Sequence, residues 1–234
     1  SSSYRLILAK TSGGFTVPSG DDGGPITNGA NHTGTIEVGD LDMWTFTANA
    51  GEAITLTMTE TSPLTNFEPN IELRAPDGSL ILVRGGATVA RLDRTLTVSG
   101  TYTVVLSSGD IGNDASSSYR LILAKTSGGF TVPSGDEGGP ITNGANHTGT
   151  IQVGDLDMWT FTANAGETIT LTMTETSPLT AFEPAIELRG PTGSSVLVRS
   201  GSALARMDIT VPASGAYIVL LSSDDIGNDS DGGY

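Results

Sequence analysis

Cysteine is missing from this chain of 234 residues, which excludes disulfides, thiolate metal sites and a cysteine nucleophile. Positive charge is scarce, since 11 Lys+Arg stand against 26 Asp+Glu and the formal net charge is -15. A nucleic-acid-binding surface needs clustered Lys and Arg, so nucleic acid is not expected as a partner. No apolar run approaches the roughly 18 to 20 residues of a membrane-spanning helix, so no membrane span is expected either.

Patterns typical of long helices are also absent, whereas glycine, at 31 residues, and threonine are abundant. This composition favours strands joined by many turns. Apolar residues alternate with Thr in segments 33–38, 42–48 and 53–60, which places residues such as Trp44 and Leu56 on a buried face. The sequence predicts an all-β fold of antiparallel β-sandwiches, with about eight strands in each.

An internal repeat organises the whole chain. Residues 1–115 align with residues 116–230 without a gap, and 23 of the 115 positions differ, which is about 80% identity. A period of 115 residues is too long for a solenoid repeat and matches a small independent domain. We therefore expect two tandem β-sandwich units.

The frame of the repeat differs from the expected frame of the domains. The segment SYRLILAK follows a hairpin-like stretch and precedes a segment rich in Gly, Ser and Pro, so it is expected to close a domain. We therefore expect the following order along the chain: a terminal strand of a preceding or neighbouring domain (1–10), a linker (11–24), sandwich repeat 1 (25–125), a second linker (126–139) and sandwich repeat 2 without its last strand (140–234).

This offset has two interpretations. In one, a long covalent repeat chain is cut at arbitrary points. In the other, the strand of residues 1–10 fills a neighbouring molecule by donor-strand complementation, with Tyr4, Leu6 and Leu8 as its interface residues. Such a head-to-tail contact does not close, so it generates filaments, and further copies or repeats of the same chain are the expected partner.

An ordered set of motifs carries a resemblance to a known family. The chain contains GTIEVGDLDMWTFTANAGE, then IELRAPDG, then SGTYTVVLSS and SYRLILAK. This series resembles the bacterial pre-peptidase C-terminal domain family over most of each repeat. The resemblance implies a jelly-roll-like β-sandwich that is secreted and non-catalytic, and it implies that binding of calcium or collagen is possible, as in some relatives.

Clusters of oxygen-bearing side chains are the main candidates for chemistry. Calcium takes about six to eight oxygen ligands, and flexible Asp/Asn/Gly loops provide them. Asx-turns and solubilising charge are the alternative explanation. The predicted calcium ligands, near the domain junctions, form three separate clusters in each repeat. Asp40 and Asp42 in GDLD lie two apart at a strand entrance, so they project to the same side of the backbone. The other clusters of the first repeat are Asp21 and Asp22 in the linker, and Asp110, Asn113 and Asp114 in a loop between the last two strands. The corresponding residues of the second repeat are Asp155 and Asp157, Asp136 and Glu137, and Asp225, Asn228 and Asp229.

Catalysis is not expected. His32 and His147, the two histidines, occupy the same repeat position, and the chain contains no G-x-S-x-G motif around a nucleophilic serine. The sequence favours an extracellular structural or adhesive protein that forms calcium-stabilised filaments. The alternative is an accessory module of a secreted hydrolase that binds an extracellular polymer such as collagen or a polysaccharide.

Overall fold

The structure, a computed structural model, describes the chain except for residues 1–5, 11–12, 63–65, 111–114, 177–181 and 225–230. The described residues form strands β1 to β18 and no helix, which confirms the all-β fold. Accordingly, this part of the chain contains no helix that is long and apolar enough to cross a membrane.

Unit 1, residues 23–125, is a sandwich of two sheets. Its strands are β1 (Gly23–Pro25), β2 (His32–Ile36), β3 (Asp42–Ala48), β4 (Ala53–Ser62), β5 (Pro69–Arg74), β6 (Leu80–Gly85), β7 (Val89–Thr95), β8 (Gly100–Ser108) and β9 (Ser117–Lys125). The sheet orders are β1-β3-β8-β5-β6 and β2-β9-β4-β7. The core between them contains Trp44, Phe46 and Leu56, as the alternating pattern predicts.

The strand count and one pairing differ from the sequence prediction. Unit 1 has nine strands because the short β1, in a Gly-Pro segment without apolar alternation, also joins a sheet. It pairs with β3 in parallel, whereas every other pairing in the described part of unit 1 is antiparallel. Gly23 suits this place, since its φ is +147° and a Cβ atom there would lie 2.5 Å from the carbonyl oxygen of Met43.

Unit 2, residues 138–234, repeats this architecture with one sheet divided. Its strands are β10 (Gly138–Pro140), β11 (Thr150–Ile151), β12 (Asp157–Ala163), β13 (Thr168–Thr174), β14 (Pro184–Arg189), β15 (Ser195–Ser200), β16 (Leu204–Thr210), β17 (Gly215–Ser223) and β18 (Gly232–Gly233). The sheets are β10-β12-β17-β14-β15, β13-β16 and β11-β18. By the repeat offset, β18 corresponds only to the first two residues of β9, so it does not bridge β11 to β13.

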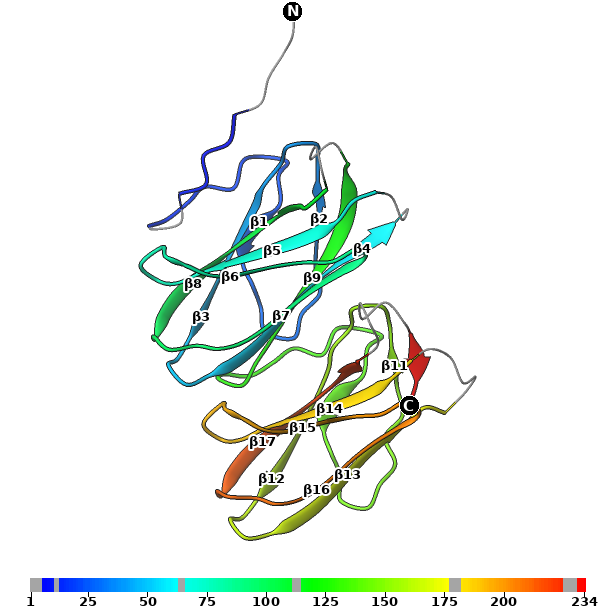
Figure 1. The fold of residues 1–234 in the computed structure, drawn as a ribbon. Coiled ribbons are helices and arrows are strands. Elements are labelled where there is room, and N and C mark those ends of the chain that lie inside the picture. Colours follow the sequence, from blue (N-terminus) through cyan, green and yellow to red (C-terminus); the bar gives the residue numbers. More distant parts are fainter. Residues whose placement is uncertain (1–5, 11–12, 63–65, 111–114, 177–181, 225–230) are drawn as a thin grey trace, which may run out of the picture.

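The two units lie one after the other with corresponding strands in similar orientation (Figure 1). The segment that precedes β1 lies at the end of unit 1 that faces away from unit 2 (Figure 1). In this segment Leu6 and Leu8 are 87% and 86% exposed, whereas Ile7 and Ala9 between and beyond them are half-buried. Tyr4, the third predicted interface residue, lies outside the described residues.

Candidate metal centres and the contact between the units

Three carboxylates converge at the entrance of β3. Asp21 precedes β1, while Asp40 and Asp42 lie in the GDLD segment, and one oxygen from each lies within 4.8 Å of the others. Asp40 and Asp42 are 2% and 0% exposed. The Tyr119 hydroxyl donates a hydrogen bond of 2.6 Å to Oδ2 of Asp42, but Oδ1 of Asp42 is buried without a hydrogen-bond partner. This oxygen is therefore available as a ligand.

The same triad recurs in unit 2. Asp136, Asp155 and Asp157 each offer an oxygen within 4.8 Å of the other two. Tyr234 donates to Oδ2 of Asp157 over 2.6 Å, and Oδ1 of both Asp155 and Asp157 is buried without a hydrogen-bond partner. Nη2 of Arg120, on β9 of unit 1, lies 4.0 Å from Asp155 Oδ1. This second triad therefore lies at the junction between the units.

In both triads the surroundings raise the pKa of a buried carboxyl group. Burial raises the pKa of Asp42 to about 7, and the hydrogen bond from Tyr119 offsets only part of the rise. Burial, together with the neighbouring Asp155 and Asp136, raises the pKa of Asp157 to about 9 against the opposing hydrogen bond from Tyr234. Grouping buried carboxylates costs free energy unless a cation compensates their charge.

The donor set of each triad could hold a hard metal ion such as calcium. Three carboxylates supply hard, anionic oxygens, and calcium accepts further backbone carbonyl or water oxygens at such a site. The described residues also assign structural roles to other predicted ligands. Asp22 Oδ2 accepts a hydrogen bond of 2.9 Å from the Thr35 amide, Glu137 Oε2 accepts one of 3.2 Å from the Thr150 amide, and Asp110 binds the Ser108 hydroxyl.

The remaining predicted ligands lie outside the residues that the structure describes. These are Asn113, Asp114, Asp225, Asn228 and Asp229. The structure thus brings together Asp21, Asp40 and Asp42, and likewise Asp136, Asp155 and Asp157. The sequence had treated the linker aspartates and the GDLD aspartates as separate clusters.

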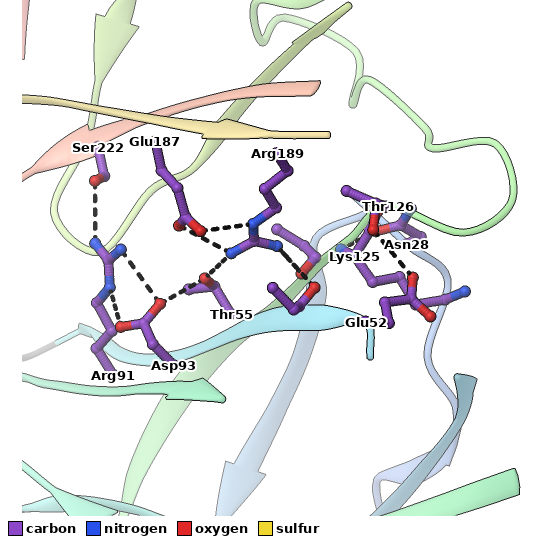
Figure 2. A network of polar contacts seen from close by, with 12 residues as sticks. Asn28, Glu52, Thr55, Arg91, Asp93, Lys125, Thr126, Glu187, Arg189 and Ser222 are labelled. Carbon is purple, nitrogen blue, oxygen red and sulfur yellow. Dashed lines mark hydrogen bonds and ion pairs between the residues drawn. The ribbon is translucent and has the colours of Figure 1, made fainter. Parts of the chain in front are cut away.

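An arginine that the sequence analysis did not single out holds the two units together. Arg189, at the end of β14, is 1% exposed. Its guanidinium donates to the carbonyl oxygens of Ala53 (3.1 Å) and Ala124 (3.0 Å) and to the hydroxyl of Thr55 (2.6 Å), all in unit 1 (Figure 2). Glu187 pairs with the same guanidinium from within unit 2. The charge of Arg189 is therefore compensated although it is buried.

The acceptor side of this contact is a small polar network on unit 1. The Thr55 hydroxyl donates to Asp93 over 2.6 Å, and Arg91 forms an ion pair with Asp93 at 3.0 Å (Figure 2). Arg91 also reaches unit 2, where its Nη1 donates to the Ser222 hydroxyl over 3.0 Å. With Arg120, three cationic side chains therefore cross the junction, two from unit 1 and one from unit 2.

The segment between the units is anchored to unit 1. Asn28 Nδ2 donates to the Lys125 carbonyl (2.8 Å), Asn28 Oδ1 accepts from the Lys125 amide (2.8 Å), and the Asn28 carbonyl accepts from the Thr131 amide (2.9 Å). Glu52 binds the amide and, at 2.8 Å, the hydroxyl of Ser127. Burial alone would raise the pKa of Glu52, but these hydrogen bonds outweigh it and hold the pKa below 4.5.

Apolar packing completes the contact. Ile122 and Ala124, on the outer face of β9, form a buried cluster with Leu156, which directly precedes β12, and with Met158 of β12. The cluster also contains Ile218 and Leu220 of β17, and Phe130 of the connecting segment packs against it. Close approach is also needed at Gly154, where φ is +68° and a Cβ atom would lie 1.9 Å from the Thr59 hydroxyl. The units therefore meet through a packed interface.

The histidines have a structural role in both units. Nε2 of His32 accepts a hydrogen bond of 2.9 Å from the Thr27 amide, and the His32 ring lies edge-on to Trp44 at 5.0 Å. His147 repeats the arrangement with the Thr142 amide (3.1 Å) and Trp159 (4.8 Å). Each ring thus fastens a turn to the core.

Comparison with known proteins gives matches among solved structures. No protein-family model and no curated protein matches the chain. Among solved structures it is similar to the pre-peptidase C-terminal domain of a collagenase from Bacillus anthracis, with 13% identity and a TM-score of 0.36 over 44% of this chain and 95% of that one. It is also similar to a protein from Eubacterium rectale that is predicted to be secreted, with 12% identity and a TM-score of 0.29 over 88% of this chain and 73% of that one.

Proposed function

We propose that this chain is a non-catalytic extracellular protein with a structural or adhesive role, whose β-sandwich units stack end to end into calcium-stabilised filaments. The observation that carries this proposal is the buried contact of Arg189 with unit 1. The proposal of secretion is supported by the motifs that resemble the pre-peptidase C-terminal domain family.

Both sides of the junction are present a second time. By the repeat offset of 115, Arg74 and Glu72 of unit 1 correspond to Arg189 and Glu187 of unit 2. They form the corresponding ion pair within unit 1. Thr170 and Asp208 of unit 2 correspond to Thr55 and Asp93, and the Thr170 hydroxyl donates to Asp208 over 2.6 Å. Each chain therefore presents one further donor surface and one further acceptor surface.

A contact of this kind is heterologous, because a different surface is used on each partner. Units that keep one orientation along the chain would repeat it without closing a ring, which favours a filament. Successive units would be joined either by continuation of a longer covalent chain or by complementation with the strand of residues 1–10. Both connections place Arg74 of one pair of units against Thr170 of the next.

Calcium has a specific task in this proposal. Each triad would hold one cation through Asp21, Asp40 and Asp42 or through Asp136, Asp155 and Asp157. The cation would compensate the buried charge and fix the segment before β1 or β10 to the entrance of β3 or β12. Because the second triad lies beside Arg120 of unit 1, calcium there would also stiffen the junction.

Particle size tests the proposal. Light scattering and negative-stain imaging in calcium should show elongated particles, and a chelator should shorten or soften them. Arg74→Glu should shorten the particles, whereas Arg84→Glu, an equal charge change on an exposed side chain whose described hydrogen bond is to the carbonyl of Val83, should not. Compact 24 kDa particles in every condition would overturn stacking. Binding of such particles to insoluble collagen or polysaccharide would then favour the accessory module.

A further inference from the structure

Unit 2 has an open groove beside β13, at the position that β9 occupies beside β4 in unit 1. The groove has a volume of about 890 Å³ and is lined by residues that include Trp159, Ile169, Leu171 and Tyr234. Ile169 and Leu171, on β13, are only partly buried. Their counterparts on β4 of unit 1, Ile54 and Leu56, are both 0% exposed, and there β9 pairs along β4.

One segment of the chain has the sequence that fills this position in unit 1. Residues 6–10 read LILAK, as do residues 121–125 in β9. In β9 Leu121 and Leu123 are 0% exposed in the core, whereas Leu6 and Leu8 are 87% and 86% exposed. The other two apolar residues of the segment, Ile7 and Ala9, are half-buried. The segment therefore presents two leucines away from its own unit.

The half-buried residues match the interface pattern of β9. Ile122 and Ala124, the counterparts of Ile7 and Ala9, belong to the apolar cluster that joins β9 to the outer face of unit 2. On unit 1, the corresponding outer face includes Met43 and Val105, which are 8% and 7% exposed. The alternation of exposure in the segment therefore matches the two faces of β9, and the leucines that correspond to its core-facing side are uncovered.

We propose that residues 6–10 of one copy of this chain bind the groove between β11 and β13 in unit 2 of a second copy. This inference rests on the proposed end-to-end stacking and names the contact that joins one chain to the next. The pairing of β9 with β4, Leu123 opposite Leu56 and Leu121 opposite Met58, sets the register. Leu8 of one copy would lie opposite Leu171 of the other, and Leu6 opposite Met173.

Polar groups beside the groove could form hydrogen bonds with the backbone of this segment. The exposed Asn143 corresponds to Asn28, whose side chain binds both backbone groups of Lys125, so Asn143 would bind Lys10 in the same way. Arg189 donates to the carbonyl of Ala124 at the end of β9. In the second contact, Arg74 would meet the carbonyl of Ala9 in its own chain and Thr170 in the other.

Because the chain has no cysteine, a disulfide can report this register. Leu8→Cys in one chain and Leu171→Cys in a second chain of distinguishable mass are mixed and oxidised. Directly opposed residues of antiparallel strands have Cα atoms about 4.5 to 5.5 Å apart, within the range that a disulfide spans. Successive side chains point to opposite faces, so Leu8→Cys with Thr172→Cys is the matched control and should give at least about tenfold less mixed disulfide.

Equal yields from the two pairs, or no mixed disulfide from Leu8→Cys with Leu171→Cys, would overturn the inference. A second measurement uses Leu6→Asp/Leu8→Asp, which changes only exposed side chains and should abolish association in light scattering. Leu80→Asp/Val98→Asp, at residues that are 53% and 52% exposed, is its control and should associate normally. Unchanged association of the Leu6→Asp/Leu8→Asp chain would also contradict strand binding.

These results separate the two proposals. If Arg74→Glu shortens the particles while the leucine variant and the disulfide pair have no effect, strand binding is wrong and stacking is retained. If the disulfide forms in the expected register while Arg74→Glu has no effect, the strand joins the copies and the stacking surface of Arg74 is wrong.

Discussion

The guanidinium of Arg189 donates a hydrogen bond of 3.0 Å to the carbonyl oxygen of Ala124, 65 residues earlier in the chain and in the other unit. Ala124 belongs to β9, the strand that also carries the apolar contact with unit 2. A single strand therefore contributes Leu121 and Leu123 to the core of its own unit and Ile122 and Ala124 to the junction. Its two faces serve two different interfaces.

Replacement of Arg189 tests how much the junction stabilises the chain. Arg189→Ala leaves Glu187 and the acceptors of unit 1 without their donor, so we expect a loss of about 3 kcal/mol in the free energy of unfolding. Arg74→Ala removes the counterpart ion pair, whose arginine side chain is 28% exposed, and should cost less than about 1 kcal/mol. Urea unfolding of dilute protein measures both. Equal losses would show that the buried contact has no special role.

Glu52 gives the junction a dependence on pH. Its pKa lies below the ordinary 4.5, so its stabilisation is complete above about pH 4.5 and is lost as the pH falls through the lowered value. Glu52→Gln should cost about 1.5 to 3 kcal/mol at pH 7, and the difference from the unchanged chain should shrink below about pH 4.

Glu167 is the matched control for Glu52. It is exposed and binds only Asn164 of its own turn, without a partner such as Ser127 among the described hydrogen bonds. Glu167→Gln should therefore change the unfolding midpoint less than Glu52→Gln does at pH 7. A loss from Glu52→Gln that is the same at pH 3 and pH 7 would contradict the assignment of the stabilisation to the carboxylate.

Asp157→Asn separates the calcium affinity from the intrinsic stability of unit 2. Because the pKa of Asp157 is raised to about 9, this carboxyl must take up a proton when the chain folds at pH 7 in a chelator. The substitution removes this cost, so the melting temperature in a chelator should rise by about 2 °C or more. The same change removes an anionic ligand, so the calcium affinity measured by calorimetry should fall at least about tenfold at that site. Asp77→Asn, at an exposed turn, should alter neither quantity. If the melting temperature of the unchanged chain is the same with calcium and with a chelator, metal binding at the triads is contradicted.

The same leucine in the two units should differ in its contribution to stability. Leu56→Ala truncates a residue that is 0% exposed and lies opposite Leu123 of the neighbouring β9, and it should cost about 3 kcal/mol. Leu171→Ala truncates a partly buried residue that faces the open groove, and should cost about 1 kcal/mol in dilute protein. Chemical unfolding of each variant checks this difference, and an equal cost would mean that the groove is closed in solution.

Much of the fold could be predicted from local pattern. Strands have a side-chain period of two, so alternation in DMWTFTA and AITLTMTE identifies Trp44, Phe46, Leu56 and Met58 as core residues without any knowledge of pairing. The histidine turns and the Asp pair of GDLD were also visible as local features. The sequence did not predict the short β1, because Gly-Gly-Pro has no apolar alternation. Its pairing with β3 depends on the tertiary path that brings these two segments side by side.

The candidate sites depended on contacts between distant segments. The sequence pointed to Asp40 and Asp42 as a pair, since residues two apart on a strand project to one side. Only the path of the preceding segment shows that Asp21 joins them while its neighbour Asp22 turns to the Thr35 amide. The junction residues Arg189, Glu52 and Asn28 gave no signal, because a charged or amide residue beside a strand is typical of any solvent-exposed edge.

By itself, the sequence determined the two repeats, the strand-rich fold, the inward face of each strand and the excess of carboxylates. Those properties follow from composition and from short-range periodicity. Only the tertiary structure decided whether the face of a strand that points away from the core of its own unit is covered. Thr55 and Thr57 are 0% exposed in unit 1, whereas Thr170 and Thr172, the same residues of the repeat, are exposed in unit 2. Identical segments differ because burial depends on which neighbour packs against them.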